Sequence, residues 1–370
     1  GTTLFAGAAA LAVANDLTLT SGSVDVDTNG FNIGLSGVIS GGATINKIGT
    51  GFLVLSGANT YSGGTTLNAG GIVVGSNSAL GTGALTMGPS TLLVAGATVT
   101  LANDVTLIGG DTISTNGFDL TLNGTVGGFG TLNKVGAGTL TLNGTNTYGT
   151  TNIVAGTINV GNANAIGAGQ LTMQTGTTLQ AGGSFALAND VLLAATGTID
   201  TNGNDLDLSG VLNGPGGLTK IGVGTLTLTN AANVYGGNTN VNAGTLLVNG
   251  TNLGSGLTTV AVGASLGGSG TIVGPVTVDD GATLFAGQLT GATVGVLTVG
   301  DLTLNNTSIL NFDFGAPNVA GLPDNDLIIV NGNLTLDGVL NVAQSPSGPG
   351  FGVGVYELFG YSGTLTDNVL

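Results

Sequence analysis

The chain has 370 residues, of which 72 are glycine, and its formal net charge is −16. Charged residues make up 6% of the sequence and hydrophobic residues 41%. This composition excludes an ordinary helical protein, because each glycine costs about 1 kcal/mol in a helix interior. It also argues against disorder, because disordered chains are poor in Leu, Ile and Val.

The only basic residues are Lys47, Lys134 and Lys220, and the chain has no His or Cys. Three isolated lysines cannot supply the clustered charge that binds phosphates, so nucleic acid is not an expected partner. The lack of Cys excludes disulfides, thiolate metal sites and thiol nucleophiles. Near the start, the apolar run 5–14 lacks the basic flank of a signal peptide, and no apolar run reaches the about 18 residues of a membrane helix.

Four sequence markers recur along the chain. Asn-Asp occurs at 15, 103 and 189, as well as at 204 and 325 outside this spacing, and Thr-Asn-Gly begins at 28, 115 and 201. The lysines are 87 and 86 residues apart, and Tyr61, Tyr148 and Tyr235 are 87 and 87 apart. These spacings predict a repeat of about 87 residues. We therefore expect repeat units at 1–88, 89–175 and 176–262, followed by a distinct C-terminal region at 263–370.

Each unit has the residue pattern of β-strands. Segments 52–56, 139–143 and 225–229 alternate with a period of two, which places Leu142 toward a core. Glycine-rich turns separate such runs. A β-sandwich usually needs a bulky aromatic core, but aromatic residues make up only 4% of the chain. Small aliphatic side chains suit the thin interior of a parallel β-helix, in which one unit would hold about four coils of roughly 22 residues.

Sharp corners of such a coil require residues that accept a positive φ. Glycine does so freely, and asparagine tolerates it. Asn29, Asn116 and Asn202 each precede a glycine within the Thr-Asn-Gly marker. We therefore expect these three residues at corners, where recurrence in successive coils would also allow stacked amide ladders.

Residues 46–70 run Asn46-Lys-Ile-Gly-Thr-Gly-Phe-Leu-Val-Leu-Ser-Gly-Ala-Asn-Thr-Tyr-Ser-Gly-Gly-Thr-Thr-Leu-Asn-Ala-Gly70. This segment resembles the autotransporter-associated β-strand repeat of bacterial passenger domains, whose pattern runs Lys-x-Gly-x-Gly-x-Leu-x-Leu-x-Gly-x-Asn-x-Tyr-x-Gly-x-Thr-x-x-x-x-Gly. Two further copies begin at Lys134 and Lys220. The resemblance implies an autotransporter passenger domain, and with it an all-β fold, a right-handed parallel β-helix (β-solenoid), located outside the cell or on its surface.

From about residue 264 the chain resembles the end of such passengers, with Gly268-Ser-Gly-Thr-Ile-Val-Gly274 as one matching element. It departs from the family at Ala286-Gly-Gln-Leu289, where members usually carry Pro-Gly-Asn-Ser. The chain begins at a repeat boundary with Gly1, so we expect it to be part of a longer precursor. We expect attachment to a membrane only through a segment outside this sequence.

The recurring lysines could act as ligand contacts if they lined one face of the solenoid. We expect instead solvated charges at strand starts, which discourage edge pairing. The tyrosines could form an aromatic stripe for sugars, although a half-buried ring that covers a turn is the simpler interpretation.

Acidic groups are the remaining candidates for chemistry. Three Asp pairs could share a strand face at the separation of about 5 to 9.5 Å that glycoside hydrolysis needs, namely Asp25 with Asp27, Asp205 with Asp207, and Asp324 with Asp326. Surface solubility is the simpler interpretation. Paired Asp at tight turns could also hold calcium, but the glycine-rich nonapeptide of calcium-binding β-rolls is absent. We therefore assign no catalytic, cofactor-binding or metal-ligating residue.

We expect a structural protein and not an enzyme, namely an exported bacterial β-solenoid that acts as a surface fibre, stalk or adhesin. The alternatives are a carbohydrate-active β-helix enzyme with an Asp pair, and the passenger of a receptor-binding or toxin autotransporter. The expected partners are other copies of the chain, head to tail, and host or environmental surfaces or polysaccharide. Self-association is expected because the open edges of a β-helix are templates for further strands.

Overall fold

Alternating buried and exposed side chains build short strands along the whole chain. In β19 (Thr139–Leu142), Leu140 and Leu142 are 0% exposed, while Thr139 and Thr141 point outward. The computed structural model describes residues 2–20, 22–288, 293–345, 348 and 350–368. All regular elements in these residues are strands, as the sequence predicts, and none of these residues belongs to a helix that could span a membrane.

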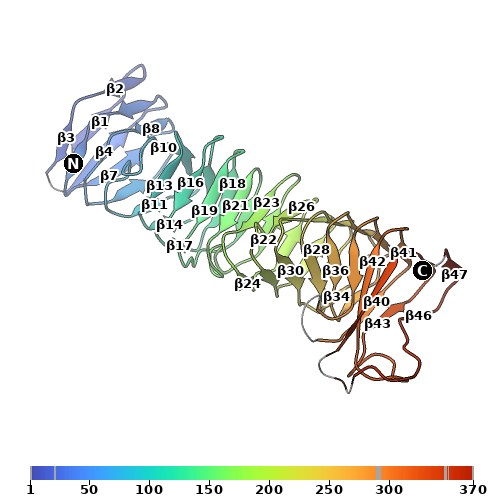
Figure 1. Ribbon diagram of the computed structural model, residues 1–370. Coiled ribbons are helices and arrows are strands. Elements are labelled where there is room, and N and C mark those ends of the chain that lie inside the picture. The colour runs from blue at the N-terminus through green and yellow to red at the C-terminus, as the bar shows by residue number, and fades with distance from the viewer. Residues whose placement is uncertain (1, 21, 289–292, 346–347, 349, 369–370) are drawn as a thin grey trace. The chain divides into compact units, whose positions relative to one another are not determined.

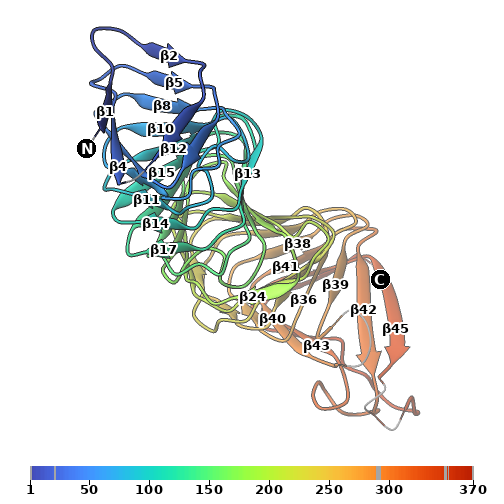
Figure 2. The same ribbon diagram turned by 90° about the vertical axis from the view of Figure 1, so that its left-hand side faces the viewer.

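The chain divides into two units, Gly1–Gln180 and Ala181–Leu370. In each unit the strands of successive coils lie side by side (Figures 1 and 2) and pair in parallel, so each unit is a stack of β-solenoid coils with three sides. Three residues named in the sequence analysis lie outside the described residues. They are the terminal residues Gly1 and Leu370, and Leu289, the last residue of the segment that departs from the family pattern.

The first unit has three stacks of strands. One runs through β1 (Thr2–Phe5), β4 (Ser23–Asp27), β7 (Thr44–Ile48), β9 (Thr65–Leu67), β11 (Leu85–Met87), β14 (Val105–Leu107) and β17 (Val126–Gly128). The second runs through β2 (Leu11–Val13), β5 (Ile33–Leu35), β8 (Phe52–Leu55), β10 (Gly71–Val74), β12 (Leu92–Ala95), β15 (Gly110–Ser114), β18 (Thr131–Val135), β20 (Thr151–Ile153) and β22 (Leu171–Met173). The third contains the pair β3 (Leu17–Leu19) and β6 (Ile39–Gly41), and then β13 (Val99–Leu101), β16 (Leu120–Leu122), β19, β21 (Thr157–Val160) and β23 (Thr178–Ala181).

The second unit has the same three-sided plan. One side contains β24 (Phe185–Leu187), β27 (Leu206–Leu208), β30 (Thr225–Leu228), β33 (Thr245–Val248), β36 (Ser265–Gly267), β39 (Thr283–Phe285), β42 (Ile309–Phe314) and β45 (Val339–Gln344). Another contains β26 (Gly197–Asp200), β29 (Leu218–Ile221), β32 (Thr239–Val241), β35 (Thr258–Val260), β38 (Val276–Val278), β41 (Leu302–Leu304), β44 (Leu334–Leu336) and β47 (Leu365–Asp367). The third contains β25 (Val191–Leu193), β28 (Leu212–Gly214) and β31 (Val234–Tyr235), and then β34 (Thr251–Asn252), β37 (Thr271–Ile272), β40 (Val296–Val299), β43 (Leu327–Val330) and β46 (Phe359–Tyr361).

The sequence repeat is not a whole number of coils. From Ile45 of β7, four coils of paired strands lead to Val126 of β17, a distance of 126 − 45 = 81 residues. The spacing from Lys47 to Lys134 is 87 residues. The excess of six residues equals one strand with its turn, so the repeat is four coils and one further side, where the sequence predicted about four coils. The borders predicted for the repeat units stay predictions.

The Thr-Asn-Gly marker forms a tight corner in each repeat. Asn29, Asn116 and Asn202 have φ values of 44°, 50° and 50°, and the glycine after each also has a positive φ. The residue after that glycine donates its N–H to the carbonyl of the marker's Thr, as Phe31 does to Thr28 at 2.7 Å. Two consecutive positive φ values inside such a hydrogen bond are the geometry of a type I′ turn, which explains the Asn-Gly sequence.

The Asn-Asp marker joins one coil to the next. A carboxylate oxygen of Asp16 accepts the N–H of Val38 at 2.7 Å. Asp104 and Asp190 make the same bond, to Thr125 and Val211, each at 2.8 Å. The marker therefore recurs because it satisfies a main-chain donor at the same point of each repeat.

Replacing Leu142 by Ala tests the inward register of β19. Leu142 is 0% exposed, so we expect the free energy of unfolding to fall by about 2 to 5 kcal/mol, from lost burial and the cavity left behind. Urea unfolding followed by circular dichroism measures the change. The neighbouring outward substitution Thr141→Ala is the control and should stay within about 0.5 kcal/mol. Equal losses in both variants would contradict the register.

Candidate functional site

The lysine of each repeat points into the solenoid. Lys47, Lys134 and Lys220 lie on β7, β18 and β29, and each is 0% exposed. Each strand alternates strictly, and the lysine occupies an inward position. The prediction of solvated charges at strand starts is therefore wrong.

The buried ammonium group is held by main-chain carbonyl oxygens. Lys134 Nζ donates to the carbonyls of Val135 at 3.2 Å, Gly136 at 2.7 Å and Ala155 at 2.9 Å. Ala155 belongs to the next coil, so the lysine joins two coils. The equivalent acceptors are Ile48, Gly49 and Ala69 for Lys47, and Ile221, Gly222 and Ala243 for Lys220, which also donates to the hydroxyl of Thr201.

Burial lowers the pKa of all three lysines from 10.5 to about 8, an effect that nearby Asp carboxylates oppose. At neutral pH the amine is therefore still mostly charged and has three protons to donate. The glycine that offers the second carbonyl has a positive φ in each repeat, as Gly136 does at 82°. A Cβ at Gly136 would lie 2.5 Å from the backbone nitrogen of Asn116, so the acceptor turn requires glycine.

The lysines do not form a row. In the first unit, Lys47 lies on β7 and Lys134 on β18, and these strands belong to two different sides of the solenoid. The cause is the extra side in each sequence repeat. A ligand-binding line of cations on one face is therefore excluded by geometry as well as by burial.

The recurring tyrosines are also inside. Tyr61, Tyr148 and Tyr235 are at most 1% exposed, and the phenol of each shares a hydrogen bond of 2.6 to 2.8 Å with a buried Thr hydroxyl. Burial raises the pKa of Tyr61 and Tyr235 to about 12, and it raises the pKa of Tyr148 as well. Both sequence interpretations are therefore wrong, because the rings are neither half-buried over a turn nor exposed as a stripe for sugars.

A third recurring residue was missed by the sequence analysis. Asn146 is 4% exposed; its Oδ1 accepts the N–H of Val126 at 2.7 Å, and its Nδ2 donates to the carbonyl of Ala165 at 2.5 Å. These partners lie in the preceding and the following coil, so one amide spans three coils. Asn59, which is 2% exposed, makes the same two bonds, to Ile39 and Ala79. Asn233, which is 0% exposed, accepts the N–H of Leu212 in the preceding coil, but its Nδ2 donates to Asn230 in its own coil. The signal was present as the Asn two residues before each recurring Tyr.

Two of the Asp pairs are engaged in bonds within the fold. The four carboxylates accept hydrogen bonds of 2.8 to 3.1 Å from other residues of the chain, with Asp25 bonded to Asn46, Asp27 to Asn29, Asp205 to Thr225, and Asp207 to Thr229. The third pair separates, because Asp326 is 2% exposed and its carboxylate lies beside Asp313 and not beside Asp324.

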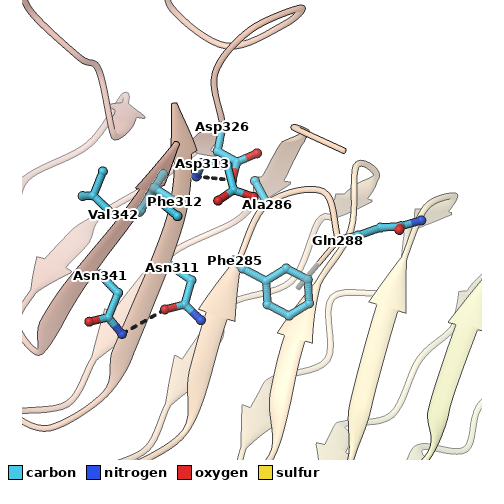
Figure 3. A pocket seen from close by; sticks show the side chains of 10 residues that line it. Phe285, Ala286, Gln288, Asn311, Phe312, Asp313, Asp326, Asn341 and Val342 are labelled. Atoms are coloured by element: carbon cyan, nitrogen blue, oxygen red, sulfur yellow. Dashed lines mark hydrogen bonds between the residues drawn. The ribbon is translucent and has the colours of Figure 1, made fainter. Parts of the chain in front are cut away.

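Asp326 is a buried acid whose carboxylate is held by the main chain and whose pKa is raised. Its two oxygens accept the N–H groups of Gly295 and Asp313, each at 2.8 Å, and Figure 3 shows the second bond. Burial raises the pKa of Asp326 to about 7, with a smaller contribution from the charge of Asp313. Both residues line a cavity of about 150 Å³ in the second unit. No group of three or more Asp or Glu side chains suited to a metal ion occurs among the described residues.

Comparison with known proteins identifies three segments of the chain as copies of one repeat. Residues 45–74, 132–160 and 218–248 match the family of the passenger-associated-transport-repeat. Each match contains the inward Lys, Asn and Tyr of one repeat. The recurring buried contacts are therefore the structural content of that family pattern.

A curated relative is the adhesin BmaC autotransporter of Brucella suis biovar 1 (strain 1330), which is 36% identical over 197 residues. The match covers 51% of this chain and 6% of the relative, so the chain spans a small part of that protein. No solved structure is significantly similar to the chain.

The substitution Lys134→Met tests the lysine contact. Methionine fills similar space but removes the donor to three part-buried main-chain carbonyls, so we expect the free energy of unfolding to fall by about 1 to 3 kcal/mol. Denaturant unfolding measures the loss. Thr121→Val on the outer face of β16 is the control, and a Lys134→Met variant as stable as the wild type would refute the role assigned to the ammonium group.

The raised pKa of Asp326 predicts a pH dependence. Because the folded-state pKa of about 7 exceeds the ordinary value of 3.8, protonation favours the folded state, and this contribution is full below about pH 4 and lost as the pH rises to about 7. We expect the difference in unfolding free energy between the wild type and Asp326→Asn to change in favour of the wild type as the pH falls through this range. Asp207→Asn is the control, and a constant difference for Asp326→Asn would contradict the prediction.

Proposed function

We propose that this chain, an autotransporter passenger segment built on three passenger-associated-transport repeats, serves as a structural shaft of a surface adhesin and not as an enzyme. One observation carries this proposal. In each matched segment the recurring Lys, Asn and Tyr side chains are buried, and the Lys and Asn bond one coil to another. Because the recurring inward residues bond neighbouring coils, they stabilise the stacked form of the solenoid. The residues on its outer faces are not needed for these bonds.

The distribution of charge supports a position outside the cell. All three basic residues are buried, so the native surface offers no Lys or Arg to trypsin-like proteases. The net charge of −16 favours solubility of an exposed repeat protein. The relative named as an adhesin autotransporter supports the same location.

Host or environmental surfaces, including polysaccharide, are the partners that we propose for the protein to which this shaft belongs. The name of the relative, an adhesin, supports a surface of this kind. Head-to-tail association of the chain with itself stays a prediction.

Lengthening the shaft tests the proposal. A second copy of residues 132–217 inserted after 217 keeps the repeat in register and adds four coils and one side. Because stacked strands are about 4.8 Å apart, the maximum dimension should grow by about 20 Å. Small-angle X-ray scattering measures that dimension, and a glycine-serine insert of equal length, which adds no coils, is the control. An unchanged maximum dimension with the repeat insert would refute the shaft.

A further inference from the structure

The cavity beside Asp326 lies on one side of the second unit, where the solenoid carries polar side chains outward (Figure 3). β39, β42 and β45 run parallel there, and their register places Phe285 beside Asn311, and Asn311 beside Asn341. One aromatic ring and two amides therefore form a row across three neighbouring strands. Two residues further along β42, Asp313 points to the same side.

The aromatic end of this row is fixed by a glycine. The ring of Phe285 is 1% exposed and lies over Gly267 of β36, where a Cβ would come within 2.2 Å of the ring. Only glycine therefore lets the ring lie close to the sheet. The ring, together with Val342, supplies apolar lining to a cavity whose other residues are mostly polar.

The two amides that line the cavity keep hydrogen-bonding capacity beyond their mutual bond. Asn341 Nδ2 donates to Asn311 Oδ1 at 3.0 Å, which leaves a donor on Asn311 and an acceptor on Asn341. The carboxylate of Asp313 adds an acceptor at the cavity wall, and the carboxylate of Asp326 is fixed by two main-chain N–H groups. Gln288 lies at the border of the same cavity.

Charge restricts the class of ligand. Two carboxylates line the cavity, and every Lys of the chain is buried in contacts elsewhere. Phosphates, sulfates and acidic sugars would meet negative charge with no cation to compensate it. A hydroxyl donates and accepts at once, so a neutral polyol can satisfy carboxylate and amide groups together.

We propose that this cavity binds one neutral sugar residue of a surface glycan, through Asp313, Asn311 and Asn341. The volume of about 150 Å³ accommodates a single sugar ring. The hydroxyls of that ring would donate to Asp313 and Asn341 and accept from Asn311, while a C–H face packs on the apolar lining. This function is additional to the shaft, and it does not depend on it.

Saturation-transfer NMR on the full chain tests the site, with glucose, galactose, mannose and N-acetylglucosamine as neutral probes and N-acetylneuraminic acid as the acidic one. We expect transfer to at least one neutral sugar and none to the acidic sugar. The variants Asn341→Ala and Asp313→Ala should reduce the transfer at least tenfold. Asn159→Ala is the matched control, because Asn159 belongs to an outward amide pair with Gln180 in the first unit and should leave the transfer unchanged.

Each result decides the proposal. Unfolding midpoints equal to that of the wild type show that Asn341→Ala and Asp313→Ala are folded. If either variant is not folded, the milder variant Asp313→Asn is used to test the cavity. No transfer to any neutral sugar, or transfer that survives the cavity variants, overturns it. Equal transfer to N-acetylneuraminic acid overturns the charge argument. Calcium chloride that shifts the unfolding midpoint of the wild type but not of Asp313→Asn, without any sugar transfer, would assign the cavity to a cation instead.

Discussion

Polar side chains buried inside the solenoid need hydrogen-bond partners, and this constraint governs the rest of the structure. A buried donor or acceptor without a partner costs about 1 to 3 kcal/mol, and the partners come from the same coil and from its neighbours. Lys134 and Asn146 meet the requirement by bonding to main-chain carbonyls of another coil. The hydrogen bonds that pair these buried polar groups also connect neighbouring coils, so the same bonds stabilise the interior and the stacking of the coils.

The mismatch between repeat and coil distributes these contacts. Because each repeat contains four coils and one side, the lysine of the next repeat in the first unit enters from a different side, on β18 and not on β7. Buried cations are thereby kept out of a common column. Coils of 18 to 22 residues leave little chain for surface features. Where the spacing rises to 26 and 30 residues, at β39 to β42 and β42 to β45, the cavity with Asp313 and Asp326 is found.

The residues that hold the coils together and those of the proposed sugar site are therefore different. The recurring Lys, Asn and Tyr of the matched segments face inward, and the Lys and Asn hold coils together. Outward positions such as Asn311 and Asn341 do not take part in the core. A solenoid built this way tolerates changes on its outer faces more easily than changes at the inward positions that bond its coils.

The sequence by itself determined the strands, the repeat of about 87 residues and the corners at Asn29, Asn116 and Asn202, because alternation, glycine and Asn-Gly act over a few residues. It could not determine that Lys47, Lys134 and Lys220 are buried, since the carbonyls that accept their bonds include one from the following coil, 21 to 23 residues away. It also paired Asp324 with Asp326 on spacing alone. Only the tertiary structure brought Asp326 to Asp313 and Phe285 to Asn311, because the register between coils depends on the lengths of the turns that separate them.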